Sequence, residues 1–204
     1  MKKSKAETAE TRKRIVETAA KAFRKQGIAA TGVAEIMATA GLTHGGFYRH
    51  FDSKDQLVRE ALSATEKNLV RDTREAAAES ADAVLKVFQD YVTQAYRDNH
   101  EDGCPMASMG SELVHADAAT RHAATSSFRT IIETAAPFLR SKDDPDGTYT
   151  ALSLITNMVG ALTVARMVDD RALSDRILEA TKRRINESVD LSAQPSPQPT
   201  EEAA

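Results

Sequence analysis

A short helical pattern, followed by a glycine-containing turn and a second short segment, constrains this chain more than any other feature. In residues 33–40, apolar side chains stand at positions 33, 36, 37 and 40, the spacing of one buried face of an α-helix. Gly41-Leu42 interrupts the pattern, and Thr43–Phe51, T-H-G-G-F-Y-R-H-F, then combines glycines with aromatic and cationic side chains. This order is typical of a helix-turn-helix, whose second helix lies in the major groove of DNA. We therefore expect Thr43–Phe51 to contact DNA.

The composition favours a protein built from helices. Of the 204 residues 41% are apolar, which is enough for a core, while only nine are Gly and Trp is absent. Ala, the best helix former, is scattered throughout, and runs of β-branched residues are nearly absent. We predict an all-α protein, either a single elongated domain or a small domain followed by a medium-sized one.

The same composition disfavours secreted and membrane proteins. The single cysteine, Cys104, cannot form an intramolecular disulfide, and no apolar segment of a secretory signal follows the polar N-terminus. No stretch approaches the roughly 18 apolar residues of a membrane span. We expect a soluble cytoplasmic protein without a membrane partner.

Charge is distributed unevenly along the chain. Residues 1–60 carry twelve Lys and Arg against seven Asp and Glu, a net charge of +5, whereas the remaining residues carry 15 against 23, a net charge of −8. A basic first quarter suits DNA, since phosphate contacts supply much of the affinity of a DNA-binding protein. The alternative is that the basic side chains of residues 2–25 only solvate a helix face.

A helix is expected before the helix-turn-helix. Ile15, Ala19 and Phe23 define one apolar face over residues 10–26, and Gly27 is well placed as a left-handed terminator, with residues 1–10 frayed. Thr31 precedes the helix of residues 33–40. Its hydroxyl can cap that helix, donate to a DNA phosphate, or do both.

A long helix is expected after the helix-turn-helix. Ser53 and Gln56 fit the S-x-x-Q capping box at its start. The apolar pattern continues to about Glu79, so the helix would be roughly 40 Å long at 1.5 Å per residue. A helix of that length can couple two domains mechanically.

The second half of the chain is predicted to contain five further helices separated by turn-forming residues. They are, in order, a helix from about residue 80 to 99, a short one opened by Pro105, one capped by Asp117 that reaches about Leu139 with Pro137 ending or bending it, one over residues 149–168, and one capped by Ser174. Ser141–Gly147, S-K-D-D-P-D-G, is a loop before the last two helices. The Pro- and Ser-rich tail, residues 191–204, is expected to be disordered.

The last two helices are candidates for a dimer interface. Residues 149–168 are strongly apolar and contain Gly160, Ala161 and Ala165, which are small enough to let another helix approach closely. Two such helices could pack against their own copies as a four-helix bundle. Packing within one chain is the alternative.

Four stretches of residues 11–62 together resemble the TetR-type bacterial transcriptional repressors. They are Ile15 with Ala19 to Phe23 and Gly27, then T-G-V-A-E-I-M-A-T-A-G-L, T-H-G-G-F-Y-R-H-F and S-K-D-Q-L. Gly103-Cys104-Pro105, with Ala107-Ser108 and Glu112-Leu113, is more weakly similar to the second domain of a subset of these regulators.

The resemblance implies a three-helix DNA-binding domain over residues 9–62. A fourth helix would join it to an all-α domain for ligand binding and dimerisation over residues 63–190, followed by the tail. Such a protein works as a homodimer on a palindromic double-stranded operator and releases it when a small-molecule effector binds. No cofactor is implied.

The family pattern carries over to the helix-turn-helix residue by residue. It implies that Lys54 contacts the DNA backbone, that Tyr48 contacts a phosphate or a thymine methyl, and that His50 contacts a phosphate or packs. His44, Gly45 and Gly46 would meet base edges, while Phe47 and Phe51 pack in the core. Ala34 departs from the pattern, since many relatives carry an Arg there. The expected DNA-binding residues are thus Thr31, Thr43, His44, Gly45, Gly46, Tyr48, His50 and Lys54.

Effector-binding candidates are the aromatic, sulfur-containing and histidine side chains expected on interior faces of the second domain. For each of them, simple core packing is the alternative. A mostly apolar cavity would suit a hydrophobic or aromatic molecule. The candidates are Phe88, Tyr91, Tyr96, Cys104, Met106, Met109, His115 and Phe128. Cys104 also precedes an expected helix N-terminus, where a thiol can sense oxidants or electrophiles.

Two other classes of function have weaker support. An enzyme could pair Cys104 with His115 as nucleophile and base, but no third orienting group or oxyanion loop accompanies them. No metal-ligand spacing and no glycine-rich phosphate loop is present, so we expect no catalytic or metal site. A structural dimer module is the remaining alternative, and it would not bind DNA.

Overall fold

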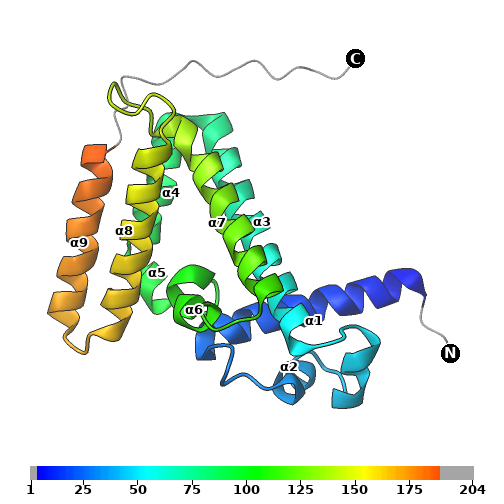
Figure 1. Cartoon of the computed structure of the whole chain (residues 1–204). Coiled ribbons are helices and arrows are strands. Elements are labelled where there is room, and N and C mark those ends of the chain that lie inside the picture. The colour runs from blue at the N-terminus through cyan, green and yellow to red at the C-terminus, as the bar shows by residue number, and fades with distance from the viewer. Residues whose placement is uncertain (1–3, 189–204) are drawn as a thin grey trace, which may run out of the picture. The chain divides into compact units, whose positions relative to one another are not determined.

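The computed structural model describes residues 4–188, apart from the side chains of residues 66, 68, 77 and 81. Helices make up its regular structure, and no strand occurs within residues 4–188, which confirms the predicted all-α class (Figure 1). The chain forms two compact units: the first combines the chain up to Leu69 with Ala95–Arg129, and the second combines Val70–Gln94 with the chain from Thr130. The predicted disordered tail lies outside the described residues.

The first unit begins with helix α1, Lys5–Gln26, which starts earlier than the sequence predicted. The Ser4 hydroxyl accepts the Glu7 N–H at 3.1 Å, and the Glu7 carboxylate accepts the Ser4 N–H at 2.6 Å. This reciprocal capping box satisfies two N–H groups that a frayed end would leave to water. Residues 5–10 are therefore helical, and the expectation that they fray is wrong.

The helix-turn-helix follows α1 in the same unit. Helix α2 spans Val33–Thr39, and a 3₁₀ helix, η1, spans His44–Arg49. Between them Gly41 has a positive φ of 70°, which a residue without Cβ adopts at little cost. The predicted order of helix, glycine turn and second helix is confirmed, although the second helix has the tighter 3₁₀ winding.

The long helix α3, Lys54–Glu79, has the predicted bounds. The Ser53 hydroxyl accepts the Gln56 N–H at 3.1 Å, as the capping box requires, while the Gln56 side chain accepts the N–H of Asp52 at 2.7 Å instead of that of Ser53. Helix α3 begins in the first compact unit and ends in the second.

The first unit also contains helix α6 and most of helix α7. Helix α6 spans Pro105–Leu113 with Cys104 as its N-cap, and α7 spans Ala118–Ala135, where the Asp117 carboxylate accepts the Thr120 N–H at 2.6 Å. Both starts agree with the sequence prediction. One core joins α1, α2, η1 and the first part of α3 to α6. Its buried members include Ile15, Phe23, Ile36, Met37, Phe47, Phe51, Leu57 and Leu62, with Met109 and Leu113 from α6.

The single helix predicted from about residue 80 to 99 is two helices. Helix α4 covers Ala81–Tyr91 and helix α5 covers Gln94–Asp98. The Ser80 hydroxyl caps α4 by accepting the Ala83 N–H at 3.1 Å. Between the helices, the Thr93 hydroxyl donates to the Asp90 carbonyl at 2.7 Å, a local bond that favours a turn over a continuing helix.

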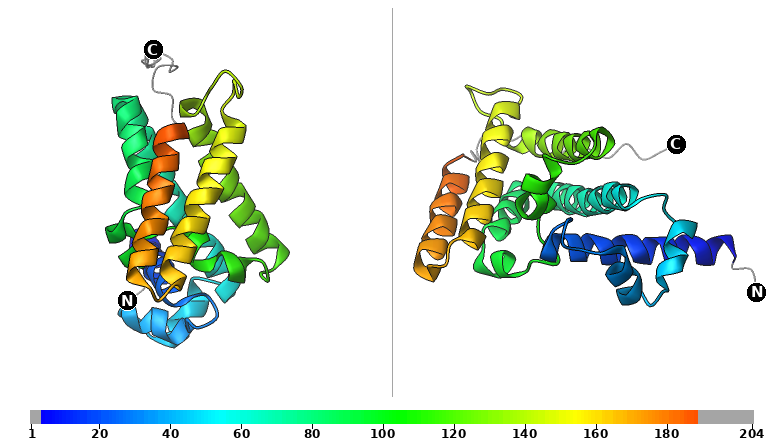
Figure 2. Two further views of the ribbon diagram at one scale, coloured as in Figure 1. Left: turned by 90° about the vertical axis from the view of Figure 1, so that its left-hand side faces the viewer. Right: turned by 60° about the horizontal axis from the view of Figure 1, so that its bottom comes forward.

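The second unit places two long antiparallel helices side by side, as both views of the ribbon show (Figure 2). They are α8, Thr148–Met167, and α9, Arg171–Ser188, and α4 also contacts α9. Asp170 caps α9 by accepting the Leu173 N–H at 3.0 Å. Ser174, the predicted cap, is instead buried and donates its hydroxyl to the Ala165 carbonyl at 2.6 Å, so that prediction is wrong.

A turn-rich segment before α8 agrees with the predicted loop. The short 3₁₀ helix η2, Ala136–Phe138, ends α7 at Pro137, and Gly147 has a φ of 74°. A Cβ at Gly147 would lie 2.0 Å from the Ala136 carbonyl oxygen, so no other residue fits there.

Helix α8 is also apolar and long enough to cross a membrane by length and composition alone, which the sequence analysis did not anticipate. This is weak evidence, because the core helix of a soluble protein passes the same test. In this structure α8 packs along α9, and several of its apolar side chains remain exposed.

Candidate nucleic-acid interface

Helix η1 presents different chemistry on its two sides. Phe47 and Phe51 are each 1% exposed and stack with ring centroids 5.5 Å apart, which confirms that both pack in the core. Tyr48 is 69% exposed and meets the Phe47 ring edge to face at 5.2 Å. The buried rings therefore hold η1 on the domain and leave the Tyr48 phenol facing solvent.

Most residues expected to contact DNA lie on the exposed side of this segment. Thr43, His44 and Gly45 are exposed, whereas Gly46 and His50 are half-buried. The His50 ring lies 6.4 Å from that of Phe51, centroid to centroid. The structure thus gathers these five residues with Tyr48 on one short element.

Gly45 has no evident structural role within the protein itself. A Cβ built on Gly45 meets no atom within 4 Å, and Gly45 is not among the described glycines with positive φ. Glycine inside a helical segment costs roughly 0.5–1 kcal/mol relative to alanine. Neither packing within the protein nor backbone conformation requires glycine at position 45. Because glycine has no side chain, another molecule can approach the backbone closely at this position.

Thr31 is placed differently from the sequence prediction. Its side chain is fully buried, at 0% exposure, and its hydroxyl donates to the Gly27 carbonyl at 2.6 Å. Gly32, which offers no side chain, is the N-cap of α2. Thr31 therefore neither caps α2 nor reaches a phosphate, because its hydroxyl closes the loop between α1 and α2.

Lys54 is also turned inward. Its Nζ donates to the Ile28 carbonyl and lies 6.0 Å from the centroid of the Phe23 ring. The side chain is half-buried. In this conformation Lys54 joins the start of α3 to the loop after α1, and it does not project a cation toward solvent as the resemblance implied.

Arg49 is a candidate that the sequence analysis missed. It is exposed in the last turn of η1, directly after Tyr48. A guanidinium next to an exposed phenol is suited to phosphate oxygens. Arg49 is the cationic residue of the T-H-G-G-F-Y-R-H-F stretch, so the sequence could have indicated it, but the family pattern pointed to Tyr48 and His50 on either side of it.

Half-buried contacts of Arg12 join α1 to α3 and to Phe51, which follows η1. The Arg12 guanidinium lies 4.2 Å from the centroid of the Phe51 ring and pairs with the Glu60 carboxylate. It thus links α1, η1 and α3 through one side chain.

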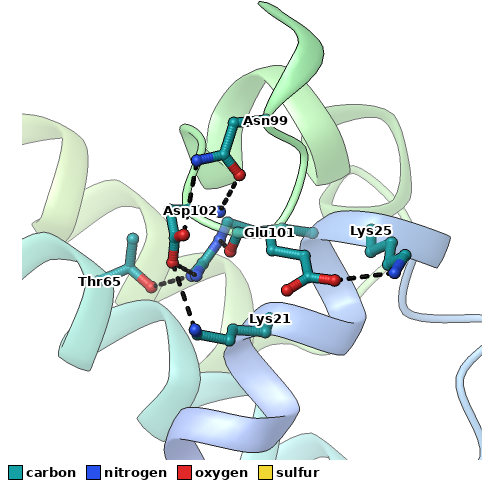
Figure 3. Close-up of polar contacts among 7 residues, drawn as sticks. Lys21, Lys25, Thr65, Asn99, Glu101 and Asp102 are labelled. Carbon is teal, nitrogen blue, oxygen red and sulfur yellow. Dashed lines mark hydrogen bonds and ion pairs between the residues drawn. The ribbon is translucent and has the colours of Figure 1, made fainter. Parts of the chain in front are cut away.

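A second polar cluster joins the C-terminal half of α1 to the loop between α5 and α6. Lys25 donates to the Glu101 carboxylate at 2.7 Å, and Lys21 pairs with Asp102 at 3.7 Å (Figure 3). The Asn99 side chain accepts the Asp102 N–H at 3.2 Å. The loop is thereby fixed to α1 by side chains whose charges complement one another.

Arg24 is the buried centre of this cluster. It is 8% exposed, and its Nη1 donates to the Thr65 hydroxyl of α3 at 2.7 Å. Burial lowers the pKa of the Arg24 guanidinium, and the neighbouring Asp102 opposes that shift. Arg24 thus ties α1 to α3 within the first unit.

The effector-binding candidates fall in both compact units. Phe88 and Tyr91 are buried in the second unit, while Tyr96, Met106 and Phe128 are half-buried in the first. Two candidates differ from the prediction. Met109 is 2% exposed and is part of the core that also contains Phe23 and Phe47, and His115 is exposed, so it does not lie on an interior face.

Cys104 is a free thiol and is buried. Among the side chains that the structure describes, no group of three or more His, Cys, Asp and Glu is arranged to hold a metal ion.

These elements define the class of the protein: a helix-turn-helix anchored by Phe47 and Phe51 in an all-α chain. Residues 15–61 match the family described as "Bacterial regulatory proteins, tetR family". The HTH-type transcriptional regulator TtgR of Pseudomonas putida is 37% identical over 108 residues, which cover 47% of this chain and 49% of that protein. The chain thus matches only about half the length of such curated relatives.

Solved structures agree over most of the chain. A TetR transcriptional regulator from Chloroflexus aurantiacus is 28% identical with a TM-score of 0.66, covering 91% of this chain and 99% of that one. The reduced form of E. coli NemR has the same fold, with a TM-score of 0.76, 20% identity, and coverage of 90% and 99%. The resemblance of residues 11–62 to the TetR-type regulators is thus confirmed by the family match over residues 15–61.

Proposed function

We propose that this protein is a homodimeric, DNA-binding transcriptional regulator, a repressor that releases a palindromic operator when a small molecule binds its C-terminal part. The observation that carries the proposal is η1, whose buried Phe47 and Phe51 anchor it while Tyr48 faces solvent. TtgR of Pseudomonas putida and the Chloroflexus aurantiacus protein are transcriptional regulators, which supports the same interpretation.

The proposed contacts divide by chemistry. His44 and Gly45 would meet base edges in the major groove, with Gly46 and Thr43 beside them. Tyr48 and His50 would contact the DNA backbone, and to these we add Arg49, which is exposed beside Tyr48. Thr31 and Lys54 are not proposed as contacts, because both are engaged within the domain.

We propose that the dimer forms through α8 and α9. Tyr149, Leu152, Val164 and Met167 recur along α8 at spacings that place them near one face, and all four are exposed. Gly160 is exposed on the same helix, and a Cβ there would meet nothing within 4 Å. A second copy would cover this apolar surface, and two-fold symmetry would match a palindromic operator with half-sites about 34–36 Å apart.

The domain division 9–62 and 63–190 remains part of this proposal, with effector binding assigned to the second part. The candidate contacts for an apolar or aromatic effector are Phe88 and Tyr91 in the second compact unit or, as a separate set, Tyr96, Cys104, Met106 and Phe128 in the first. Binding would favour a dimer conformation whose two η1 helices no longer fit both half-sites. We further propose that the protein is soluble and cytoplasmic and that it has no catalytic activity.

The test begins with duplexes selected by the full-length protein from a random pool. Arg49→Ala is expected to weaken binding across the selected sequences, and to reduce the slope of log affinity against log salt by about two, since each copy of the dimer loses one phosphate contact. Arg140→Ala removes the same charge from an exposed position outside η1 and serves as the control.

Two outcomes would count against the proposal. If no duplex is retained by the wild-type protein, the DNA-binding function itself is wrong. If Arg49→Ala and Arg140→Ala change the salt slope equally, η1 is not the element that faces DNA. The effector part of the proposal has its own test. Compounds that raise the melting temperature of the free protein are expected to release the selected duplex from the wild-type protein.

A further inference from the structure

The loop between α1 and α2 is held by a carboxylate from α6. The Glu112 side chain accepts the N–H of Ile28 through Oε1 at 2.9 Å and the N–H of Ala29 through Oε2 at 2.6 Å. The Ile28 carbonyl in turn accepts the Lys54 ammonium from α3. The polar groups of Ile28 are therefore fixed from α6 on the N–H side and from α3 on the carbonyl side.

Gly27 shows how closely the loop is fitted to this carboxylate. A Cβ at position 27 would lie 2.5 Å from Glu112 Oε1, a separation that real Cβ contacts do not show. Gly27 also has a φ of 89° and donates its N–H to the Phe23 carbonyl at the end of α1. The residue that ends α1 must therefore lack a side chain for Glu112 to occupy its position.

This loop leads directly into the helix-turn-helix. Gly32, the N-cap of α2, has no side chain with which to fix the start of that helix. Helix α2 packs against η1, and the Met37 methyl of α2 lies 3.5 Å from where a Cβ on Gly46 would be. A displacement of residues 28 and 29 would thus be transmitted through α2 to the exposed residues of η1.

Helix α6 lies far from the helix-turn-helix in sequence yet shares its core. Met109 and Leu113 of α6 are buried in the same cluster as Ile36 and Phe47. Apolar packing of this kind is non-directional, whereas the two hydrogen bonds of Glu112 fix the loop at defined atoms. The carboxylate therefore couples the position of α6 to the path of the backbone before α2.

We propose that Glu112 is a positioning residue for DNA binding: its two hydrogen bonds to the loop make the orientation of α2 and η1 depend on α6. This inference rests on the proposed DNA-binding function. Through the side chain of Glu112, a change in the position of α6 would alter the orientation of η1.

The experiment compares E112Q with the wild type in the full-length protein. An amide can present its oxygen to only one of the two N–H groups, because its NH₂ is a donor. Amide hydrogen exchange of Ile28 and Ala29 in the free protein should become faster, and affinity for the selected duplex should fall about fivefold to tenfold, up to the equivalent of one hydrogen bond. The melting temperature should change little.

Two further variants separate positioning from a general effect of charge or stability. E133Q removes an exposed carboxylate from α7 and should leave both readouts unchanged. E112D retains the carboxylate on a shorter side chain and should recover part of the DNA affinity. If E112Q folds poorly, E112D against E133Q carries the comparison, and weaker binding with faster exchange at residues 28 and 29 is again expected.

Each remaining outcome has a defined meaning. Unchanged exchange at Ile28 and Ala29 in a folded E112Q would show that the carboxylate does not hold the loop. Faster exchange with unchanged DNA affinity would overturn the positioning role and leave the proposed function intact. Failure of the wild type to retain any duplex would overturn the proposed function, and the role of Glu112 with it.

Discussion

Arg24 donates its Nε–H to the main-chain carbonyl oxygen of Glu101, with nitrogen and oxygen 2.6 Å apart. The contact joins α1 to the loop between α5 and α6. Because Arg24 is almost completely buried, its guanidinium depends on these protein acceptors in place of water. The first compact unit is thus held together by a buried cation as well as by its apolar core.

Arg24→Met is predicted to lower the free energy of unfolding by about 3 kcal/mol. The methionine fills similar space, but the Glu101 carbonyl and the Thr65 hydroxyl each lose a hydrogen-bond partner. Urea unfolding followed by circular dichroism measures the change. Lys25→Met is the control, since it removes the same charge from an exposed ion pair and should have little effect; equal losses in both variants would contradict a special role for the buried cation.

Gly45→Ala is predicted to separate stability from binding. The free energy of unfolding should rise by about 0.5–1 kcal/mol, because alanine is the better helix residue and its Cβ has open space. DNA affinity should fall about tenfold, because the added methyl group would occupy the contact surface. Gly110→Ala, whose Cβ is also unobstructed, should stabilise without weakening DNA binding. Unaltered affinity in Gly45→Ala would place the DNA elsewhere.

Val164→Glu is predicted to convert the proposed dimer to a monomer. Val164 is 40% exposed on α8, and in a symmetric interface the new carboxylate would be desolvated once in each copy. Sedimentation equilibrium at concentrations where the wild type is dimeric measures the effect. Ala119→Glu adds the same charge to an exposed position of α7 and should stay dimeric; a dimeric Val164→Glu would exclude this face of α8 as the interface.

Asp117→Asn is predicted to change how stability depends on pH. Hydrogen bonds from the Thr120 side chain and backbone N–H, with a smaller contribution from Arg59, hold the pKa of Asp117 below its ordinary value of 3.8. The unfolded chain therefore binds the proton more readily. The stabilisation is complete above the ordinary pKa and is lost as pH falls through the lower folded-state value.

The variant should accordingly be less stable than the wild type near neutral pH, and the difference should narrow below about pH 4. Asparagine still caps a helix, so α7 should persist. Urea midpoints across a pH series measure the difference. A gap that stays constant with pH would show that the charge of Asp117 contributes nothing.

Sequence patterns that depend on neighbouring residues predicted the structure well. The apolar spacing of residues 33–40, the turn at Gly41 and the Ser53 and Asp117 caps all recur in the structure. Each depends on contacts within a few residues. The packing of Phe47 and Phe51 was also predictable, since large aromatic side chains are rarely left exposed without a reason.

The errors arose where distant residues decide the role of a polar side chain. Thr31 and Ser174 looked like helix caps, but both are buried; Ser174 donates to the Ala165 carbonyl of the preceding helix, and Thr31 donates to the Gly27 carbonyl only four residues away. Lys54 looked like a surface cation, but the Ile28 carbonyl lies within its reach. The opposite error occurred at Ser4, where a local capping box was present in the sequence and was overlooked.

The contact of Glu112 with the loop was beyond sequence reasoning for the same cause. Glu112 appeared only as part of a weak resemblance, and nothing around it indicates that its partners are the backbone N–H groups of Ile28 and Ala29. Backbone donors have no signature in a sequence. Only the folded chain shows that a residue of α6 completes the loop after α1.

The close approach of Gly27 to Glu112 also limits how this sequence can evolve. A side chain at position 27 and a carboxylate at position 112 exclude one another in this conformation, although the two residues are far apart in the chain. A lineage that replaced Glu112 would be released from the steric part of the constraint, while the positive φ would still favour glycine. A side chain at position 27 would therefore require the Glu112 carboxylate to move away from the loop, so the consequence of a substitution at one position depends on the residue at the other.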